Sequence, residues 1–177
     1  MLKKIGISIL LGMSLFGNTF NDFNKEVIKL NTAEKNKEVI KEELMKMVDF
    51  NLMGKLTLGK SIWLNINENQ KKEYITLYEN KIKRNYLKYL TEIKKVEIKD
   101  VKRKKNKYLI NIVADDHNLK VFAYDNNKIF KIYNIEVDGI NLIKLLGQDY
   151  RNQFKINGFK GILDILKKAK EDTIKQG

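Results

Sequence analysis

Between residues 20 and 66 the hydrophobic positions recur at intervals of three and four, a period that predicts helices rather than strands. Two glycines, Gly54 and Gly59, punctuate the end of this region. The apolar positions define three successive helical runs. These runs are Phe20, Phe23, Val27 and Leu30; then Ile40, Leu44, Met47 and Val48; then Phe50, Met53 and Leu56.

A longer helix is predicted from about Asn67 to Glu92. Asn67 can cap its first turn, and Gln70 follows at the position that completes a capping box. Its apolar stripe is unusual because most of its members are tyrosines: Tyr74, Tyr78, Ile82, Tyr86 and Tyr89 or Leu90. A buried tyrosine hydroxyl needs a hydrogen-bond partner. The stripe therefore indicates either packed core or a wall that borders an amphipathic ligand.

After residue 95 the hydrophobic period changes to two, which predicts β-strands. Four alternating segments follow one another, separated by short polar turns at 102–106, 115–118 and 125–127. Connections this short join antiparallel neighbours. The positions that share the inward face are Val96, Ile98 and Asp100; Tyr108, Ile110, Ile112 and Ala114; Leu119, Val121 and Ala123; and Ile129, Lys131, Tyr133, Ile135 and Val137.

Two helices are predicted to close the chain, with Gly158 marking the break between them. Their apolar positions are Ile140, Ile143, Leu146, Tyr150 and Phe154, then Phe159, Ile162, Leu163 and Leu166. Helices before and after a four-stranded meander predict an α+β fold, with helices packed on one face of an antiparallel sheet. A curved sheet beneath a long helix can enclose an apolar cavity.

The first 19 residues are typical of a signal peptide. Lys3 and Lys4 precede an apolar run of 13 residues, from Ile5 to Gly17. This run is too short for a bilayer, which needs about 20 residues. The alternative is a buried N-terminal helix. We expect export, with residues 20–177 forming a single domain.

The chain is strongly basic, with a formal net charge of +13, but its cations are nearly all lysines. Only Arg84, Arg103 and Arg151 are arginines. Surfaces that read nucleic acid depend on the planar guanidinium, so we expect no nucleic-acid partner. The basic run 102–105 lies in a predicted turn, where it forms a solvated hairpin tip or a binding patch. The absence of cysteine excludes disulfides, thiolate metal sites and a lipid-modified N-terminus.

The residues that catalysis would need are sparse. His117 is the single histidine, next to Asp115 and Asp116 in a predicted turn where aspartate is favoured for backbone reasons. Ser61 is the one serine after the signal peptide, and it lies in no nucleophile motif. We therefore expect neither an enzyme nor a metal site or cofactor.

Six stretches of the sequence together resemble the MlaC family of periplasmic phospholipid-binding proteins, which are also called toluene-tolerance proteins. They lie in order between residues 20 and 170. The stretches are Val48-Asp49-Phe50 with Met53 and Leu58-Gly59-Lys60; Trp63 with Gln70, Tyr74 and Tyr78; Arg84-Asn85-Tyr86 with Leu90; residues 130–142; residues 150–154; and Gly158-Phe159 to Leu163. Within residues 130–142, Asn134 replaces an aspartate of the family pattern.

The resemblance implies an NTF2-like α+β fold with a deep lipid pocket. It also implies a periplasmic carrier of diacyl phospholipid as cargo, working between an outer-membrane lipoprotein complex and an inner-membrane ABC-transporter complex that carries an MCE-domain ring. Such a carrier maintains the lipid asymmetry of the outer membrane. The alternative is a periplasmic protein-interaction module whose pocket is vestigial.

The apolar faces suggest which side chains line the cavity: Met53, Leu56, Tyr78, Ile82, Tyr86, Val121, Ala123, Tyr150, Phe154 and Leu163. Arg84 and Arg151 are candidates for the head-group region, because an arginine in a lysine-rich chain marks a site where a bidentate fork is useful. Ion pairing within the fold is the alternative role for both.

Overall fold

The computed structural model describes residues 19–31, 37–126 and 129–174, and the side chains of 86–89, 91 and 169–174 are not described. The predicted signal peptide lies outside this part of the chain except for Thr19. The Thr19 hydroxyl accepts a hydrogen bond from the backbone N–H of Asp22, and the Asp22 carboxylate accepts one from the backbone N–H of Thr19. This capping box begins the first described helix.

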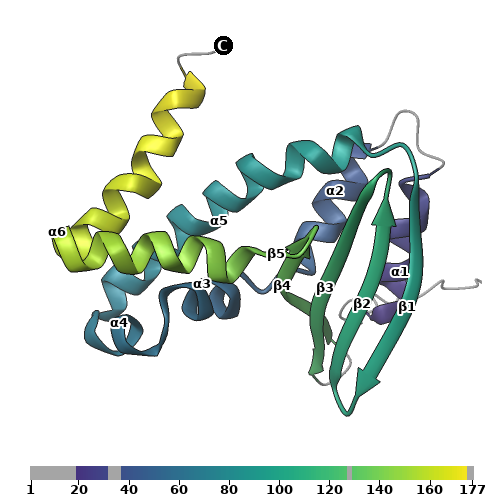
Figure 1. Cartoon of the computed structure of the whole chain (residues 1–177), viewed down its shortest axis with the longest axis horizontal. Coiled ribbons are helices and arrows are strands. Elements are labelled where there is room, and N and C mark those ends of the chain that lie inside the picture. The colour runs from purple at the N-terminus through teal and green to yellow at the C-terminus, as the bar shows by residue number, and fades with distance from the viewer. Residues whose placement is uncertain (1–18, 32–36, 127–128, 175–177) are drawn as a thin grey trace, which may run out of the picture.

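Six helices and five strands make up the described chain (Figure 1). They occur in the order α1 (Phe20–Lys29), α2 (Lys37–Lys46), α3 (Phe50–Leu58), α4 (Lys60–Asn65), α5 (Glu68–Glu92), β1 (Val96–Lys104), β2 (Lys107–Ala114), β3 (His117–Asn126), β4 (Ile129–Val137), β5 (Ile140–Asn141) and α6 (Leu142–Ile174). The α+β class is confirmed, as is a capping box at Asn67 and Gln70 before α5.

The strands form one open antiparallel sheet in chain order, β1-β2-β3-β4-β5. Four strands were predicted, and the fifth is a short addition. Asp138 and Gly139 have positive φ angles of 48° and 83°, which turn the chain back so that Ile140 pairs with Val137. The last helix therefore begins at Leu142 rather than at Ile140.

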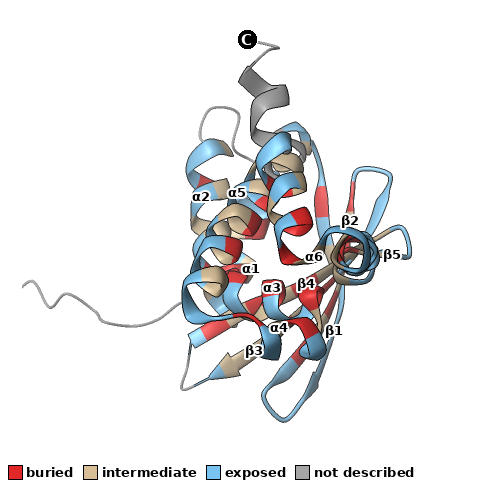
Figure 2. Ribbon diagram, turned by 90° about the vertical axis from the view of Figure 1, so that its left-hand side faces the viewer, coloured by how far each residue is buried: buried red, intermediate tan, exposed pale blue. Residues whose placement is uncertain are grey.

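One face of the sheet is covered by α1, and an aromatic cluster fills the contact. Phe20 of α1 stacks on Tyr108 of β2 at 5.5 Å between ring centroids, and Phe23 lies 5.2 Å from Phe130 of β4. Buried residues line the sides of the helices and strands that face each other (Figure 2). The alternation of inward and outward residues along β2 and β3 follows the prediction. The predicted inward face of β4 was wrong, because the buried residues are Phe130, Ile132 and Asn134, whereas Ile129 is exposed. Both faces of β4 carry large apolar residues, so alternation alone did not distinguish them.

The chain between α2 and α3 joins the helices to the sheet. Val48 forms a parallel bridge with Ile132 of β4, supported by backbone hydrogen bonds from Asp49 to Ile132 and from Ile132 to Met47. The Asp49 carboxylate caps α3 by accepting a hydrogen bond from the backbone N–H of Leu52. It also accepts a hydrogen bond from the hydroxyl of Tyr124 on β3, with 2.5 Å between the two oxygens. One aspartate thus fixes the start of α3 against the sheet.

Helices α3, α5 and α6 pack together away from the sheet (Figure 1). Glycines allow two close approaches: a methyl group on Gly147 of α6 would lie 2.6 Å from the Thr57 carbonyl oxygen of α3, and one on Gly54 would meet Ile75 of α5. Gly158, with φ 62° and ψ −162°, kinks α6, so that two helical segments follow each other as predicted. Among the described residues, no helix is long and apolar enough to cross a membrane.

Candidate functional site

Most of the predicted cavity residues belong to one continuous apolar core that extends from the sheet into the helices. Six are buried members of it, namely Met53, Tyr78, Ile82, Val121, Ala123 and Tyr150. Phe154 and Leu163 are partly buried and pack against it. The structure therefore brings together residues from α3, α5, α6 and β3 that are far apart in the sequence.

Two of the ten predicted residues are not part of this set. Leu56 is 44% exposed, because the side of α3 that faces the core carries Met53 and Thr57 instead. Leu56 and Thr57 point about 100° apart around the helix axis, and the packing of α3 against α5 buries Thr57 and leaves Leu56 at the surface. Tyr86 lies in α5, and its side chain is outside the described part of the structure.

The tyrosine stripe of α5 forms packed core. Tyr74 donates a hydrogen bond to the Gly54 carbonyl, and the Tyr78 hydroxyl lies 3.0 Å from the Thr57 hydroxyl. The Tyr74 ring meets Tyr150 of α6 edge to face, at 6.2 Å between centroids. Burial beside these two tyrosines raises the pKa of Tyr74 well above its usual value of 10. In this conformation, aromatic rings occupy the space between α3, α5 and α6.

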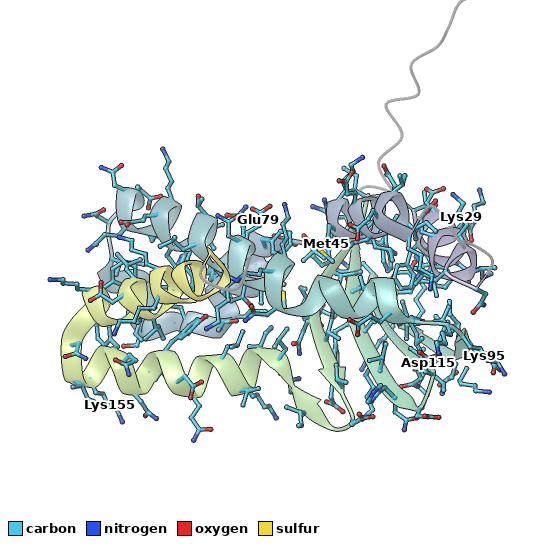
Figure 3. The ribbon with its side chains drawn as sticks, turned by 90° about the horizontal axis from the view of Figure 1, so that it is seen from above. Lys29, Met45, Glu79, Lys95, Asp115 and Lys155 are labelled. Carbon is cyan, nitrogen blue, oxygen red and sulfur yellow. The ribbon has the colours of Figure 1, made fainter. Side chains whose placement is uncertain are left out.

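Two hollows on the surface are lined mainly by polar side chains. One, of about 200 Å³, lies beside β1 and is lined by Lys95, Glu97, Lys99, Val113 and Asp115. Asp115 accepts hydrogen bonds from the backbone N–H groups of Lys94 and Lys95 there (Figure 3). The other, of about 280 Å³, is lined by Asn51, Trp63, Glu68, Lys71, Lys72, Ile75 and Thr76. Neither is the predicted apolar cavity, which stays a prediction.

A half-buried cationic cluster lies where α5 meets α6. Burial lowers the pKa of Lys81, the nearby Asp149 carboxylate opposes this shift, and the Arg84 guanidinium adds to it. The Lys81 ammonium lies 5.6 Å from the centre of the Tyr150 ring. With two cations and one carboxylate, the cluster keeps a net positive charge at the edge of the apolar core.

Arg84 has an unused donor. Its Nη2 is buried and has no hydrogen-bond partner among the described residues, while its Nε makes a long 3.4 Å contact with the Asn85 side chain. A buried donor without an acceptor is destabilising, so an anionic ligand would gain by binding there. Arg151, the other predicted head-group residue, is exposed on α6. The alternative role, an ion pair within the fold, is not made by the Arg84 Nη2 with any described residue.

The residues weighed for catalysis lie apart. Ser61 is in α4, and His117 is at the start of β3, in a different part of the molecule (Figure 1). His117 Nδ1 lies 2.7 Å from the Asp138 carboxylate, which raises the pKa of His117 and lowers that of Asp138. Among the described residues, no group of three histidine or carboxylate side chains could hold a metal ion.

Sequence reasoning did not identify Lys81 as a candidate, and it named Asn134 only as a departure from the family pattern. Lys81 had no signal, because one lysine in a lysine-rich helix resembles the others. Alternation gave no signal for Asn134, because it placed Ile129 and Tyr133 on the inward face, whereas the structure buries Asn134 on the other face. Its side chain is 8% exposed, and its Oδ1 has no hydrogen-bond partner in the described part of the chain.

Comparisons with known proteins agree with this geometry. A family model described as "MlaC protein" matches residues 15–168. A phospholipid-binding protein from Ralstonia solanacearum, whose structure was solved in complex with a phospholipid, has a similar fold with a TM-score of 0.68. The similarity covers 85% of this chain and 93% of that one at 12% identity, so it bears on the fold alone. No curated protein matches the sequence.

Proposed function

Because this chain belongs to the MlaC family, we propose that it is a periplasmic carrier that takes up one diacyl phospholipid and delivers it between the two membranes of the cell envelope. Family membership points to binding or transport rather than to catalysis. The observation that carries the proposal is the single apolar core shared by the sheet and by α3, α5 and α6. Acyl chains inserted between these layers would contact side chains that already form an apolar surface.

The proposed acyl-chain site uses the core residues that separate when the layers part. From the sheet these are Val121 and Ala123, and from the helices Met53, Tyr78, Ile82, Tyr150, Phe154 and Leu163. Each half already presents an apolar face to the other, so opening requires movement of helices rather than refolding. Binding then shifts the population toward the open form by as much as the ligand prefers it.

The proposed head-group site is the cationic cluster on α5. Arg84 is the better candidate of the two predicted arginines, because its buried Nη2 lacks an acceptor among the described residues and Lys81 supplies a second cation nearby. A phosphodiester offers two acceptor oxygens and one negative charge, which a guanidinium can bind in a bidentate manner. Arg151 is proposed only as an outer contact, since it is exposed.

The cargo determines how transfer must occur. Burying a methylene group is worth about 0.8 kcal/mol, so releasing two acyl chains with roughly 30 methylenes into water would cost on the order of 20 kcal/mol. The carrier must therefore deliver its lipid in contact with a membrane or a partner. Its proposed partners are the inner-membrane ABC-transporter complex with an MCE-domain ring and the outer-membrane lipoprotein complex, and its role is to maintain lipid asymmetry.

A second candidate function is a periplasmic interaction module whose pocket is vestigial. The filled space between Tyr74, Tyr78 and Tyr150 favours it, because no opening is needed for a surface that only binds proteins. The two functions differ in one observable property, which is whether the protein moves lipid.

A transfer assay distinguishes them. Fluorescent phospholipid in donor vesicles is mixed with acceptor vesicles, with and without the purified protein. The carrier should accelerate transfer when the vesicle populations share one chamber, and it should have no effect when a dialysis membrane that retains the protein keeps it from the acceptors. A protein that accelerates nothing in the shared chamber, even after preloading with lipid, would support the interaction module instead.

A further inference from the structure

The densest run of positive charge in the sequence lies at one end of the sheet. Residues 102–107, which form the end of the β1–β2 hairpin, include five basic residues and no acidic one. We call this segment the basic tip: Lys102, Arg103, Lys104, Lys105 and Lys107, around Asn106. All of these residues are exposed, and the end of the hairpin extends beyond the helices (Figures 1 and 2).

Several lysines elsewhere on the surface are paired with neighbouring acids. In α1, α2 and α5, pairs such as Lys29–Glu26, Lys41–Glu38 and Lys71–Glu68 join a lysine to an acid three residues away. At the basic tip, only Lys102 has such a neighbour, Asp100 at 3.8 Å. Lys104, Lys105 and Lys107 have no acidic partner among the described residues. No other six-residue stretch of the sequence contains five basic residues.

The tip is also held in a fixed shape. The Arg103 guanidinium lies 5.1 Å from the centre of the Tyr108 ring, and its Nε donates a hydrogen bond to the Lys105 carbonyl. Tyr108 belongs to the aromatic cluster beneath α1, so the turn is anchored to the core. Lys105 takes a positive φ of 55° in the two-residue turn. These contacts fix the backbone of the turn, so the basic side chains start from neighbouring, fixed positions.

From these observations we infer that the basic tip is a docking surface for an anionic lipid bilayer. The partner is a membrane rather than a protein because of size: a stable protein contact buries about 800 Å² on each side, more than a two-residue turn and its flanking strand ends provide. A bilayer instead gathers mobile anionic head groups around a few fixed cations. Ile129, 41% exposed at the start of β4 on the same end of the sheet, adds an apolar contact for the interfacial region.

This inference goes beyond the proposed cargo binding, since docking through the tip uses none of the core residues. It places the sheet end of the molecule against the membrane, while the cationic cluster between α5 and α6 lies on the helical side. Each basic side chain near an anionic surface strengthens binding by a factor of about five. Removing three of them should therefore weaken docking by at least about tenfold, allowing for incomplete contact.

The test compares two triple variants of equal net charge in a vesicle co-sedimentation assay. The tip variant carries Lys104→Gln, Lys105→Gln and Lys107→Gln. The control variant carries Lys41→Gln, Lys83→Gln and Lys167→Gln, three lysines that are ion-paired with Glu38, Glu79 and Glu73. The vesicles are phosphatidylcholine alone, or phosphatidylcholine mixed with phosphatidylglycerol.

We expect the wild-type protein to bind only the mixed vesicles, and to release them at about 1 M salt, where the Debye length is about 3 Å. The tip variant should lose at least about tenfold in affinity, and the control variant less than about twofold. Equal losses in both variants would overturn the inference in favour of net charge alone. Undiminished binding of the tip variant would overturn it too. Phospholipid retained by each variant, measured by mass spectrometry, reports separately on the carrier function.

Discussion

The half-buried side chain of Arg84 and the buried side chain of Asn134 each hold a buried polar atom that no described residue hydrogen-bonds. Such atoms are rare in folded proteins, because a buried donor or acceptor without a hydrogen-bond partner typically costs about 1–3 kcal/mol of stability. They point to a binding site when a ligand can supply the missing hydrogen-bond partner. Arg84 can donate to a phosphate, and the Asn134 oxygen can accept from a hydroxyl or an ammonium group.

Arg84→Gln should weaken lipid retention without weakening the fold. A charged hydrogen bond is worth about 1.5–3 kcal/mol, so the phospholipid retained through purification should fall at least tenfold. The unfolding free energy of the lipid-free protein should change by less than about 0.5 kcal/mol, because the Arg84 Nη2 has no hydrogen-bond partner among the described residues. Quantitative mass spectrometry and urea denaturation measure the two effects.

Arg151→Gln is the matched control, since it makes the same arginine-to-glutamine change at an exposed position. It should lower retention by less than Arg84→Gln does. An Arg84→Gln protein that retains lipid normally, or that loses stability and lipid together, would assign Arg84 to the fold instead.

Asp49 and Tyr124 should stabilise the protein as a pair. Burial and the hydrogen bond to Asp49 raise the pKa of Tyr124 to about 12, which is consistent with a strong contact between them. Tyr124→Phe should reduce the unfolding free energy by about 1 kcal/mol, and by much less when Asp49→Asn is already present. Asparagine keeps the cap of α3 and removes the negative charge, so the double-mutant cycle isolates the charge-assisted part of the contact with Tyr124.

Urea denaturation of the four proteins gives the coupling energy. A value below about 0.3 kcal/mol would mean that the two side chains are independent and that Asp49 serves α3 alone.

At the scale of elements, the sequence predicted the order of the helices and strands well, and their first and last residues less well. Ile140 and Ile143 continue the helical spacing of the last helix, so their period could not reveal that Ile140 pairs with Val137. The hairpin turn at 102–106 was predicted too long, because β1 becomes charged on both faces while its backbone pairing continues to Lys104. Hydrophobic alternation reports burial, and backbone hydrogen bonds can extend beyond it.

The ion pair between His117 and Asp138 joins the β2–β3 turn to the β4–β5 turn, and its effect on stability should depend on pH. The pKa of His117 is raised above 6.5 by Asp138, so its contribution is present below pH 6.5 and is lost as pH rises through the folded-state pKa. The pKa of Asp138 is lowered below 3.8, so its contribution is lost only as pH falls through that lower value. The difference in melting temperature between wild type and His117→Gln should be largest near pH 5 and should shrink toward pH 8.5.

Asp116→Asn is a suitable control, because Asp116 is an exposed neighbour in the same turn whose loss should produce a smaller and different pH profile. A His117→Gln difference that stays constant from pH 5 to 8.5 would show that the pair contributes no charge-dependent stability.

At the scale of the whole molecule, the α+β fold and its family could be predicted from the sequence, but the interior could not. Leu56 and Thr57 are adjacent, and only the packing of α3 on α5 shows that Thr57, with its hydroxyl bonded to the Met53 carbonyl, is the buried one. Cavity volume depends on ångström-scale distances between helices, which periodicity does not encode. For the same reason, the sequence could not show that Tyr74 and Tyr150 are in contact in this conformation.

The central claim is that this protein holds a phospholipid, and native mass spectrometry of the wild-type protein purified from the periplasm tests it most directly. The account predicts a species heavier than the polypeptide by the mass of one diacyl phospholipid, and the same phospholipid in an organic extract of the sample. Denaturation should reduce the protein to the mass of the polypeptide alone. A protein that has only the polypeptide mass, and that acquires no lipid after incubation with phospholipid vesicles, would contradict the account.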